Sequence, residues 1–328
     1  MARSRVPVTV RPRTVVVGMV VIIAAAAAVV VAILLWPQQR PGQVDLAGPT
    51  KEIVSFAGVF PAIEDESLVN PLGIAFDGEY LYVAESDAGV VRVFDTRGGV
   101  VGSIVLPVAD GQVSAYPSVI AVAGRRLAIV DNAGNRVIIV DAEPAELAKV
   151  TVVLGAEGEA PRQPTAVTYA VSEFFVADSA DKTIKVYNEE GVHQRTLEPE
   201  SLQAESAITA LCVKDGLILA TGSSSGAVYV LDGENGAVAG DPFGGYSMAR
   251  TLEPVGEEVF AIVDGLDRSV TFADLGGAER AMIDSDSVPD AVMSSPRGAT
   301  WIGDDGRLYV TDSGSGRVFV YNVRAVEL

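Results

Sequence analysis

Cysteine and histidine are almost absent from this sequence of 328 residues, which contains one of each. A single cysteine excludes an intramolecular disulfide, and it also excludes CxxC metal sites and CxxCH haem attachment. Cys212 stands in the apolar run ITALCV, where we expect a buried core residue. His193 is the only histidine, so it is the only candidate for the histidine of a catalytic Ser-His-Asp triad, in which a serine nucleophile needs a general base.

Basic residues are also scarce. Beyond residue 40 the chain carries 19 Lys and Arg against 43 Asp and Glu, a net charge of −24. Nucleic-acid binding requires clustered Lys and Arg that neutralise phosphates, so this composition excludes a nucleic-acid partner. Two interpretations of the charge remain. It keeps a monomeric surface domain soluble, or it selects for cations or a basic protein partner.

Long apolar runs are confined to the N-terminus. Residues 1–13 hold four arginines and no acid, and residues 14–36, which begin at Thr14 and end at Trp36, contain no charge over 23 positions. That length spans a hydrocarbon core of about 30 Å. The excess of positive charge before the span predicts a cytoplasmic N-terminus, a single transmembrane signal-anchor helix in the cytoplasmic membrane, and an external C-terminal part.

A cleaved signal peptide is the alternative to this anchor. Such a peptide has an apolar core of roughly 7–15 residues followed by small residues at the cleavage site. Here the core is longer and runs into Trp36-Pro37-Gln38-Gln39, which favours the anchor. Residues 37–50 are rich in Pro, Gly and Gln and predict a linker of at most roughly 45 Å. Residues 51–328 then form one folded domain outside the membrane.

The external part repeats one pattern six times: a short apolar strand, an acidic or glycine-rich turn, and a second strand. Aligned on the residue that closes the first of these strands, the copies lie 46, 47, 44, 42 and 48 residues apart. A period of this length is typical of propeller blades, which bury their faces only against neighbours. The aligned residues, which we call the anchors, are Glu85, Asp131, Asp178, Gly222, Asp264 and Asp312.

Each copy supplies four strands, with one exception. An apolar run precedes the anchor strand, and a further run follows most copies, at 100–106, 149–155, 192–197, 237–240 and 279–283. The sixth copy has no clear fourth run, whereas residues 52–58 (EIVSFAG) form a surplus strand before the first copy. We therefore predict an all-β, six-bladed β-propeller in which the N-terminal strand completes the last blade and leaves no dangling edge.

The repeated sequence resembles the NHL repeat. The matching segments are Pro71 with GIA (73–75), LYVA (81–84) and VFD (93–95), VADS (176–179), DNAGNRV (131–137) and LYVTDSGSGR (308–317). The fourth and fifth copies lack the proline, and the fourth has Gly222 in place of the acid. The resemblance implies a six-bladed propeller and is weak for function, because the family includes binding modules, receptor sensors and a few enzymes.

Three sets of residues are candidates for ligand binding at the mouth of the central channel. The acidic anchors could hold Ca²⁺, which takes six to eight oxygen ligands, but Asp repeated in most blades is also typical of turns, where it accepts backbone hydrogen bonds. Three acidic loops are further candidates near the same mouth: 64–66, the loop with Glu198, Glu200 and Glu205, and 284–290. The positions predicted to line the channel mouth are Asn70, Tyr116, Gln163, Arg250 and Arg297.

Two motifs match enzyme or calcium-binding patterns only in part, because the residues around them differ from what those patterns require. The run GSSSG at 222–226 matches G-x-S-x-G, but another strand follows it, whereas the hydrolase elbow leads into a helix. The acidic run at 284–286 lacks the Gly and Glu of a calcium loop, since Pro289 and Ser295 stand there. The sequence thus predicts a non-catalytic, membrane-tethered module that binds a protein or envelope partner and requires no cofactor. A calcium-dependent hydrolase like the six-bladed lactonases is the alternative.

Overall fold

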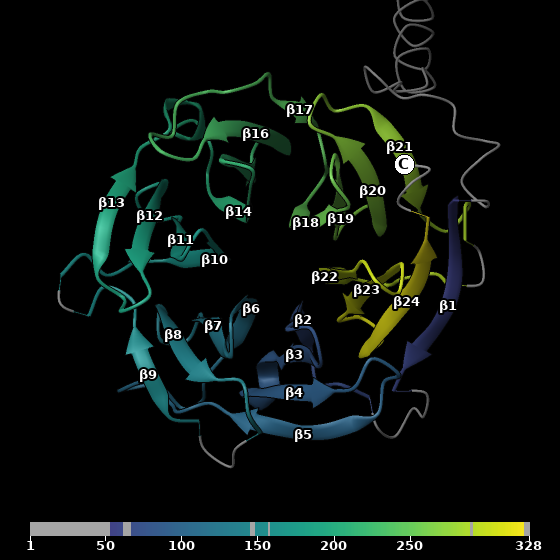
Figure 1. The fold of residues 1–328 in the computed structure, drawn as a ribbon, viewed down its shortest axis with the longest axis horizontal. Coiled ribbons are helices and arrows are strands. Elements are labelled where there is room, and N and C mark those ends of the chain that lie inside the picture. The colour runs from purple at the N-terminus through teal and green to yellow at the C-terminus, as the bar shows by residue number, and fades with distance from the viewer. Residues whose placement is uncertain (1–52, 62–66, 145–147, 157, 289–290, 325–328) are drawn as a thin grey trace, which may run out of the picture. The chain divides into compact units, whose positions relative to one another are not determined.

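The computed structural model describes residues 53–61, 67–144, 148–156, 158–288 and 291–324. These residues form six antiparallel sheets of four strands each, and Figure 1 shows the sheets, or blades, standing around a common centre. The predicted six-bladed β-propeller is therefore confirmed. The segments predicted as cytoplasmic (1–13), transmembrane (14–36) and linker (37–50) lie outside the described residues. Within the described part of the chain, no helix has the length and apolar character needed to cross a membrane.

The first three blades follow the repeats in chain order, each from the innermost strand outward. Blade 1 consists of β2 (Pro71–Phe76), β3 (Leu81–Glu85), β4 (Val90–Phe94) and β5 (Val100–Val105). Blade 2 consists of β6 (Pro117–Ala123), β7 (Arg126–Asp131), β8 (Arg136–Asp141) and β9 (Val150–Val153). Blade 3 consists of β10 (Pro164–Ala170), β11 (Glu173–Asp178), β12 (Thr183–Asn188) and β13 (His193–Leu197).

The remaining blades keep this order until the last strand. Blade 4 consists of β14 (Ile208–Lys214), β15 (Leu217–Gly222), β16 (Ala227–Asp232) and β17 (Phe243–Gly244). Blade 5 consists of β18 (Ala249–Val255), β19 (Val259–Asp264), β20 (Ser269–Asp274) and β21 (Glu279–Ile283). Blade 6 consists of β22 (Pro296–Ile302), β23 (Arg307–Asp312), β24 (Arg317–Val323) and β1 (Val54–Phe60). In the described part of the chain, the 3-10 helices η2 (Ser86–Ala88) and η3 (Glu200–Leu202) lie in loops.

The ring is closed by the N-terminal strand, as the sequence predicts. β1 pairs antiparallel with β24, so that Val54 lies opposite Val323 and Phe60 opposite Val318. Figure 1 shows β1 as the outermost strand of blade 6, beside β24. The strand occupies residues 54–60 rather than the predicted 52–58. The aromatic ring of Phe60 reaches into blade 1, where its centroid lies 5.0 Å from that of Phe94.

The core lies between blades rather than within them. On β3, Tyr82 and Ala84 pack in one hydrophobic cluster with blade 2, while Leu81 and Val83 pack in another with blade 6. Successive side chains of a strand point to opposite faces, so a sheet between two neighbours needs apolar residues at every position. This explains why the anchor strands are continuous apolar runs. Six such clusters occupy the six interfaces between adjacent blades.

The outer strand of blade 4 differs from the prediction. The run 237–240 is not a strand: Val238 makes one isolated bridge to Leu231, and the outer strand is the two-residue β17, which pairs with the beginning of β16. The backbone N–H groups of Ala239 and Gly240 both donate to the carbonyl of Val230, which interrupts a regular ladder. Ala and Gly have low strand propensity, and this accounts for the irregular edge.

Candidate functional site in the central channel

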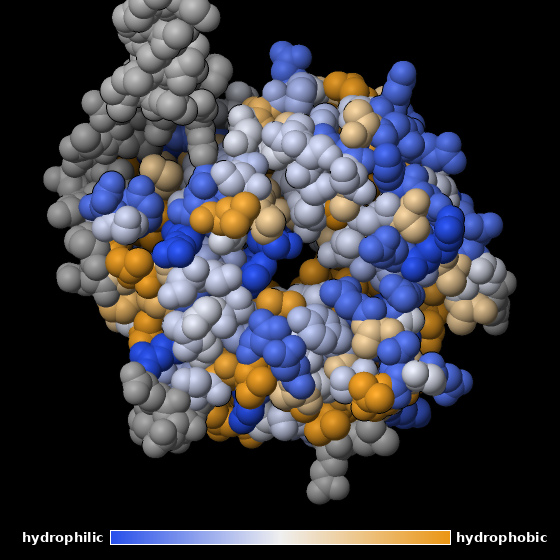
Figure 2. Space-filling model, turned by 180° about the vertical axis from the view of Figure 1, so that it is seen from behind, coloured by the Kyte–Doolittle hydropathy of each residue, from blue (hydrophilic) through white to orange (hydrophobic). Residues whose placement is uncertain are grey.

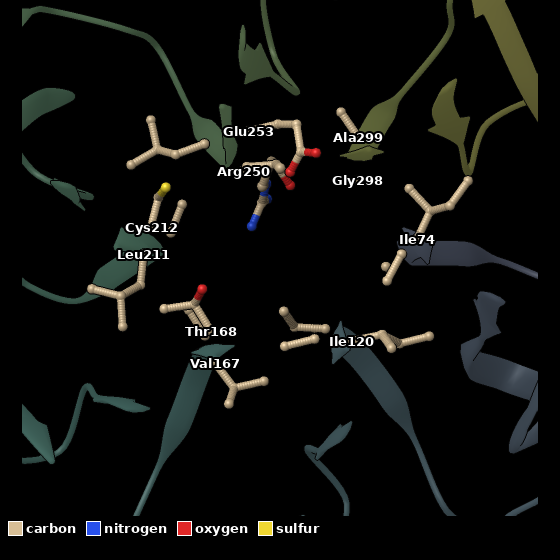
Figure 3. Close-up of a pocket in the computed structure, with 18 of the residues that line it drawn as sticks. Ile74, Ile120, Val167, Thr168, Leu211, Cys212, Arg250, Glu253, Gly298 and Ala299 are labelled. Atoms are coloured by element: carbon tan, nitrogen blue, oxygen red, sulfur yellow. The ribbon is translucent and has the colours of Figure 1, made fainter. Parts of the chain in front are cut away.

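The six innermost strands surround a central cavity of about 590 Å³. Each of them is the inner edge of its sheet, so the channel wall consists of free strand edges as well as side chains. Figure 3 looks into this cavity, and Figure 2 shows an opening at the centre of the ring with hydrophilic residues beside it. The volume lies within the roughly 300–1,000 Å³ that is typical of small-molecule pockets.

Two arginines occupy the same position in neighbouring blades. Arg250 is the second residue of β18 and Arg297 the second residue of β22, and both line the cavity. The Nε atom of Arg297 donates to Ser313 Oγ at 3.1 Å. The Arg250 guanidinium donates to the sulfur of Met248, while its buried Nε has no hydrogen-bond partner among the described residues. Burial and the positive charge of Arg297 lower the pKa of Arg250, and the charge of Asp264 opposes them.

A carboxylate, Glu253, shares this wall. It is the fifth residue of β18 and reaches the next blade, where Oε1 accepts the backbone N–H of Trp301 at 2.7 Å and the Thr300 hydroxyl at 3.4 Å. Burial raises the pKa of Glu253 to about 7, and the two hydrogen bonds offset the increase only in part. The sequence analysis missed this residue. The sequence feature that could have revealed Glu253 is a single acid within an otherwise uncharged segment, TLEPV.

The opposite part of the wall is apolar. β2, β6, β10 and β14 contribute mainly aliphatic side chains, among them Ile74, Ile120, Val167 and Leu211. Ser118, Thr165, Thr168 and Thr209 add hydroxyl groups, and Figure 3 shows that of Thr168 directed toward the centre. The cavity is therefore amphipathic, with its charged groups on blades 5 and 6.

The residues predicted at the channel mouth fall into two groups. Arg250 and Arg297 line the cavity. Asn70, Tyr116 and Gln163 each precede an innermost strand by one residue and are not among its lining residues. Asn70 Nδ2 instead donates to Tyr116 Oη at 3.0 Å and to Asp87 at 3.2 Å. The division arises because the first group takes the second position of its strand, beside a β-bulge that follows the first residue.

The five acidic anchors are fully buried and hold the loops that lead into the innermost strands. Each anchor lies opposite the first residue of its innermost strand, and its carboxylate accepts backbone N–H groups from the one or two residues before that strand. Such hydrogen bonds fix the loop, which is the turn role considered for these residues. The donors are Val69 for Glu85, Tyr116 for Asp131, Arg162 and Gln163 for Asp178, Ser247 and Met248 for Asp264, and Ser294 and Ser295 for Asp312.

In the first three blades a cation completes this arrangement. Arg92 lies 2.7 Å from Glu85, Arg136 lies 2.9 Å from Asp131, and the buried Lys185 lies 3.0 Å from Asp178. Burial favours the protonated form of Asp178, but the N–H donors and Lys185 outweigh it, so the pKa of this carboxyl is lowered.

In blade 4 the anchor is Gly222, which has no carboxylate. A carboxylate from the loop before the innermost strand links the two loops instead. Glu205, in the loop that leads into β14, accepts the N–H groups of Ser224 and Ser225 and the Tyr229 hydroxyl. A Cβ at position 222 would collide with the Glu205 carboxyl, so glycine makes room for it. Burial opposes ionisation of Glu205, but these hydrogen bonds prevail and lower its pKa.

The serines of the GSSSG run have a structural task in this blade. Ser224 Oγ accepts the N–H of Ser206 at 3.0 Å, and Ser223 Oγ accepts that of Ala207 at 2.9 Å. These are the N–H groups that an acidic anchor satisfies in the other blades. The run connects two strands, β15 and β16, as expected from the sequence, and His193 lies on the outer strand of blade 3.

The acidic loop at 64–66 lies outside the described residues, as do residues 289 and 290 of the acidic loop at 284–290. Among the residues that are described, no group of three or more His, Cys, Asp and Glu side chains is arranged to hold a metal ion.

Comparison with known proteins identifies the fold alone. No model of a protein family matches this chain, and no curated protein matches it. A chain of the mitotic checkpoint complex superimposes with a TM-score of 0.54 at 12% identity, over 76% of this chain and 73% of that chain. The computationally designed Ika8 protein gives a TM-score of 0.47 at 16% identity, over 77% and 71%. The class that the fold defines is the six-bladed β-propeller, and at these identities the likeness carries no activity or partner to this chain.

Proposed function

We propose that this chain is a membrane-tethered, non-catalytic binding module whose propeller acts outside the cytoplasmic membrane. The observation that carries the proposal is the closed ring around an amphipathic cavity, because a rigid ring with one central pocket and two loop-covered rims is suited to binding. The tether rests on the uncharged residues 14–36 and the arginines before them. The resemblance to NHL repeats supports the same assignment.

The partner proposed for the rim is a protein or an envelope component. The two rims can be probed separately, because loops between blades lie on one face and the turns from the first to the second strand of each blade lie on the other. Asp286, between β21 and β22, is exposed on the first face, and Val171, between β10 and β11, is 82% exposed on the second.

The test is photo-crosslinking in cells that produce the full chain with a photoreactive residue at either position. We expect the chain in the carbonate-resistant membrane fraction, accessible to protease added outside the cytoplasmic membrane. We also expect a discrete crosslinked species from one position, with the other serving as the matched control. A soluble chain would refute the tether, and crosslinks to many proteins at equal yield from both faces would refute a dedicated partner.

A further inference from the structure

The central cavity contains two arginines, Arg250 and Arg297, on the same wall as Glu253. Among the described residues neither Arg250 nor Arg297 forms an ion pair, although the chain carries 43 acidic side chains. Arg92, Arg136 and Lys185, by contrast, are paired with anchors. Arg250 and Arg297 are both part-buried, and removing a charge from water is unfavourable unless a partner compensates for it. Other part-buried cations of the described residues, such as Lys214 and Arg307, also form no ion pair, but Arg250 and Arg297 are the ones that line the cavity.

The surroundings of Arg250 are shaped for its side chain. Gly265 begins the turn after β19, and a Cβ at that position would lie 3.2 Å from Arg250 Cγ and 3.4 Å from its Nε. The absence of a side chain there leaves space for the arginine. Its buried Nε lacks an acceptor among the described residues, and Figure 3 shows the guanidinium directed into the cavity. An unsatisfied buried donor costs about 1–3 kcal/mol, which an acceptor supplied by a ligand would recover.

The lining of the cavity beyond the two arginines indicates which class of anion would fit there. Guanidinium groups form two parallel hydrogen bonds with a carboxylate or a phosphate. An inorganic anion would use only the arginines, whereas Leu72, Val119 and Ala121 line the same space with part-exposed apolar side chains. Burial of an apolar group there contributes about 25 cal/mol per Å². The volume of about 590 Å³ accommodates both parts of such a ligand.

We propose that the channel binds a small organic acid, with its carboxylate between Arg250 and Arg297 and its apolar body against the aliphatic wall of β2 and β6. This site rests on the proposal that the propeller is a binding module, and it names the chemical class of one ligand. It is distinct from the rim surface that would hold a protein partner.

Isothermal titration of the full chain in detergent provides the test, with hexanoate as the probe and hexanamide as its uncharged match. Inorganic phosphate serves as the anion without an apolar body. We expect saturable binding of hexanoate, no binding of hexanamide, and weaker binding of phosphate. Arg250→Gln and Arg297→Gln should each weaken hexanoate binding at least tenfold. Arg268→Gln, on an exposed turn of blade 5, should leave it unchanged.

The titration can refute the proposed carboxylate site in several ways. No saturable hexanoate binding, equal binding of hexanamide, or full affinity in both glutamine variants would overturn the site, and phosphate bound as tightly as hexanoate would overturn the apolar part. Both variants are expected to fold, because each removes a cation that forms no ion pair, and a cooperative melting transition verifies this. Membrane fractionation and rim crosslinking of the same variants separate a failure of this site from a failure of the proposed function.

Discussion

In blade 4 the carboxylate and the anchor position are separated. The carboxylate belongs to Glu205, in the lead-in loop before the innermost strand, and the anchor position holds Gly222. In five blades the carboxylate stands at the end of the second strand and accepts N–H groups of the loop opposite. In blade 4 the carboxylate stands in that loop and accepts the N–H groups of Ser224 and Ser225 beyond the strand. The lead-in N–H groups of blade 4 are satisfied instead by the hydroxyls of Ser224 and Ser223, which indicates that satisfaction of these N–H groups is the structural requirement.

A double-mutant cycle tests this relocation of the carboxylate. Glu205→Ala should lower the free energy of unfolding by about 2–4 kcal/mol, because it removes the carboxylate that accepts the N–H groups of Ser224 and Ser225 and the Tyr229 hydroxyl. Gly222→Asp alone should also destabilise, since its side chain collides with Glu205. Combined, the two changes should cost less than their sum by 1 kcal/mol or more, because the aspartate then has space. Urea unfolding measures all four proteins, with the exposed Glu198→Ala as control. Strict additivity would contradict the relocation.

Glu253 makes the stability of the molecule depend on pH. Its folded pKa of about 7 lies above the unfolded value of about 4.3, so only the unfolded state ionises between these values. The free energy of unfolding therefore decreases as pH rises from about 4.5 to 7. Glu253→Gln removes this effect, and its stability relative to the native chain should increase by roughly 2 kcal/mol between pH 4.5 and pH 8. Urea unfolding at both pH values measures the change, and a constant difference would contradict it.

At the scale of the strand, β1 fastens the ring chiefly through Phe60. The side chain is 6% exposed and contacts Phe94 of blade 1 and Tyr309 of blade 6, so it joins the two ends of the blade series. Phe60→Ala should destabilise the protein by about 3–5 kcal/mol, the usual cost of removing a buried aromatic ring. Val113→Ala, at a position that is 99% exposed, is the control and should change stability by less than 0.5 kcal/mol. Thermal melting of both variants measures the difference.

The strands were predictable from sequence because the period is strong and both faces are buried. The run LYVA at 81–84 becomes part of β3, and the surplus strand before the first copy becomes β1. Prediction failed where local propensity was weak. The run AVAG at 237–240 looked like a strand, but its ladder is interrupted and the pairing moves to Phe243.

The site was predictable only in part, because channel geometry depends on register. All five positions were predicted at the channel mouth; Arg250 and Arg297 line the cavity, whereas Asn70, Tyr116 and Gln163 stand one residue before an innermost strand and do not line it. The bulge after the first residue of each innermost strand determines which side chain faces the cavity, and the sequence does not reveal it. Glu253 was missed because a single acid in an apolar strand has no periodic signal.

At the scale of the whole molecule, the charge of −24 beyond residue 40 opposes the compact state. Added salt screens this repulsion, because the Debye length falls from about 30 Å at 0.01 M to about 10 Å at 0.1 M ionic strength. The melting temperature should therefore rise by a few degrees between 10 mM and 300 mM NaCl. KCl at the same concentrations should produce the same increase, since ionic strength is the cause. A constant or falling melting temperature would show that ion pairs such as Arg92 with Glu85 dominate.

The pairing of β1 with β24 also orders assembly in time. Strand β1 leaves the ribosome first but has no partner until β24 follows more than two hundred residues later, which at 5–20 residues per second takes roughly 15–50 s. During that interval the earliest strand is an open edge. Ring closure then occurs only in a chain that has been translated through residue 323. A prematurely terminated product therefore retains an unpaired strand edge, which is a template for pairing with other chains.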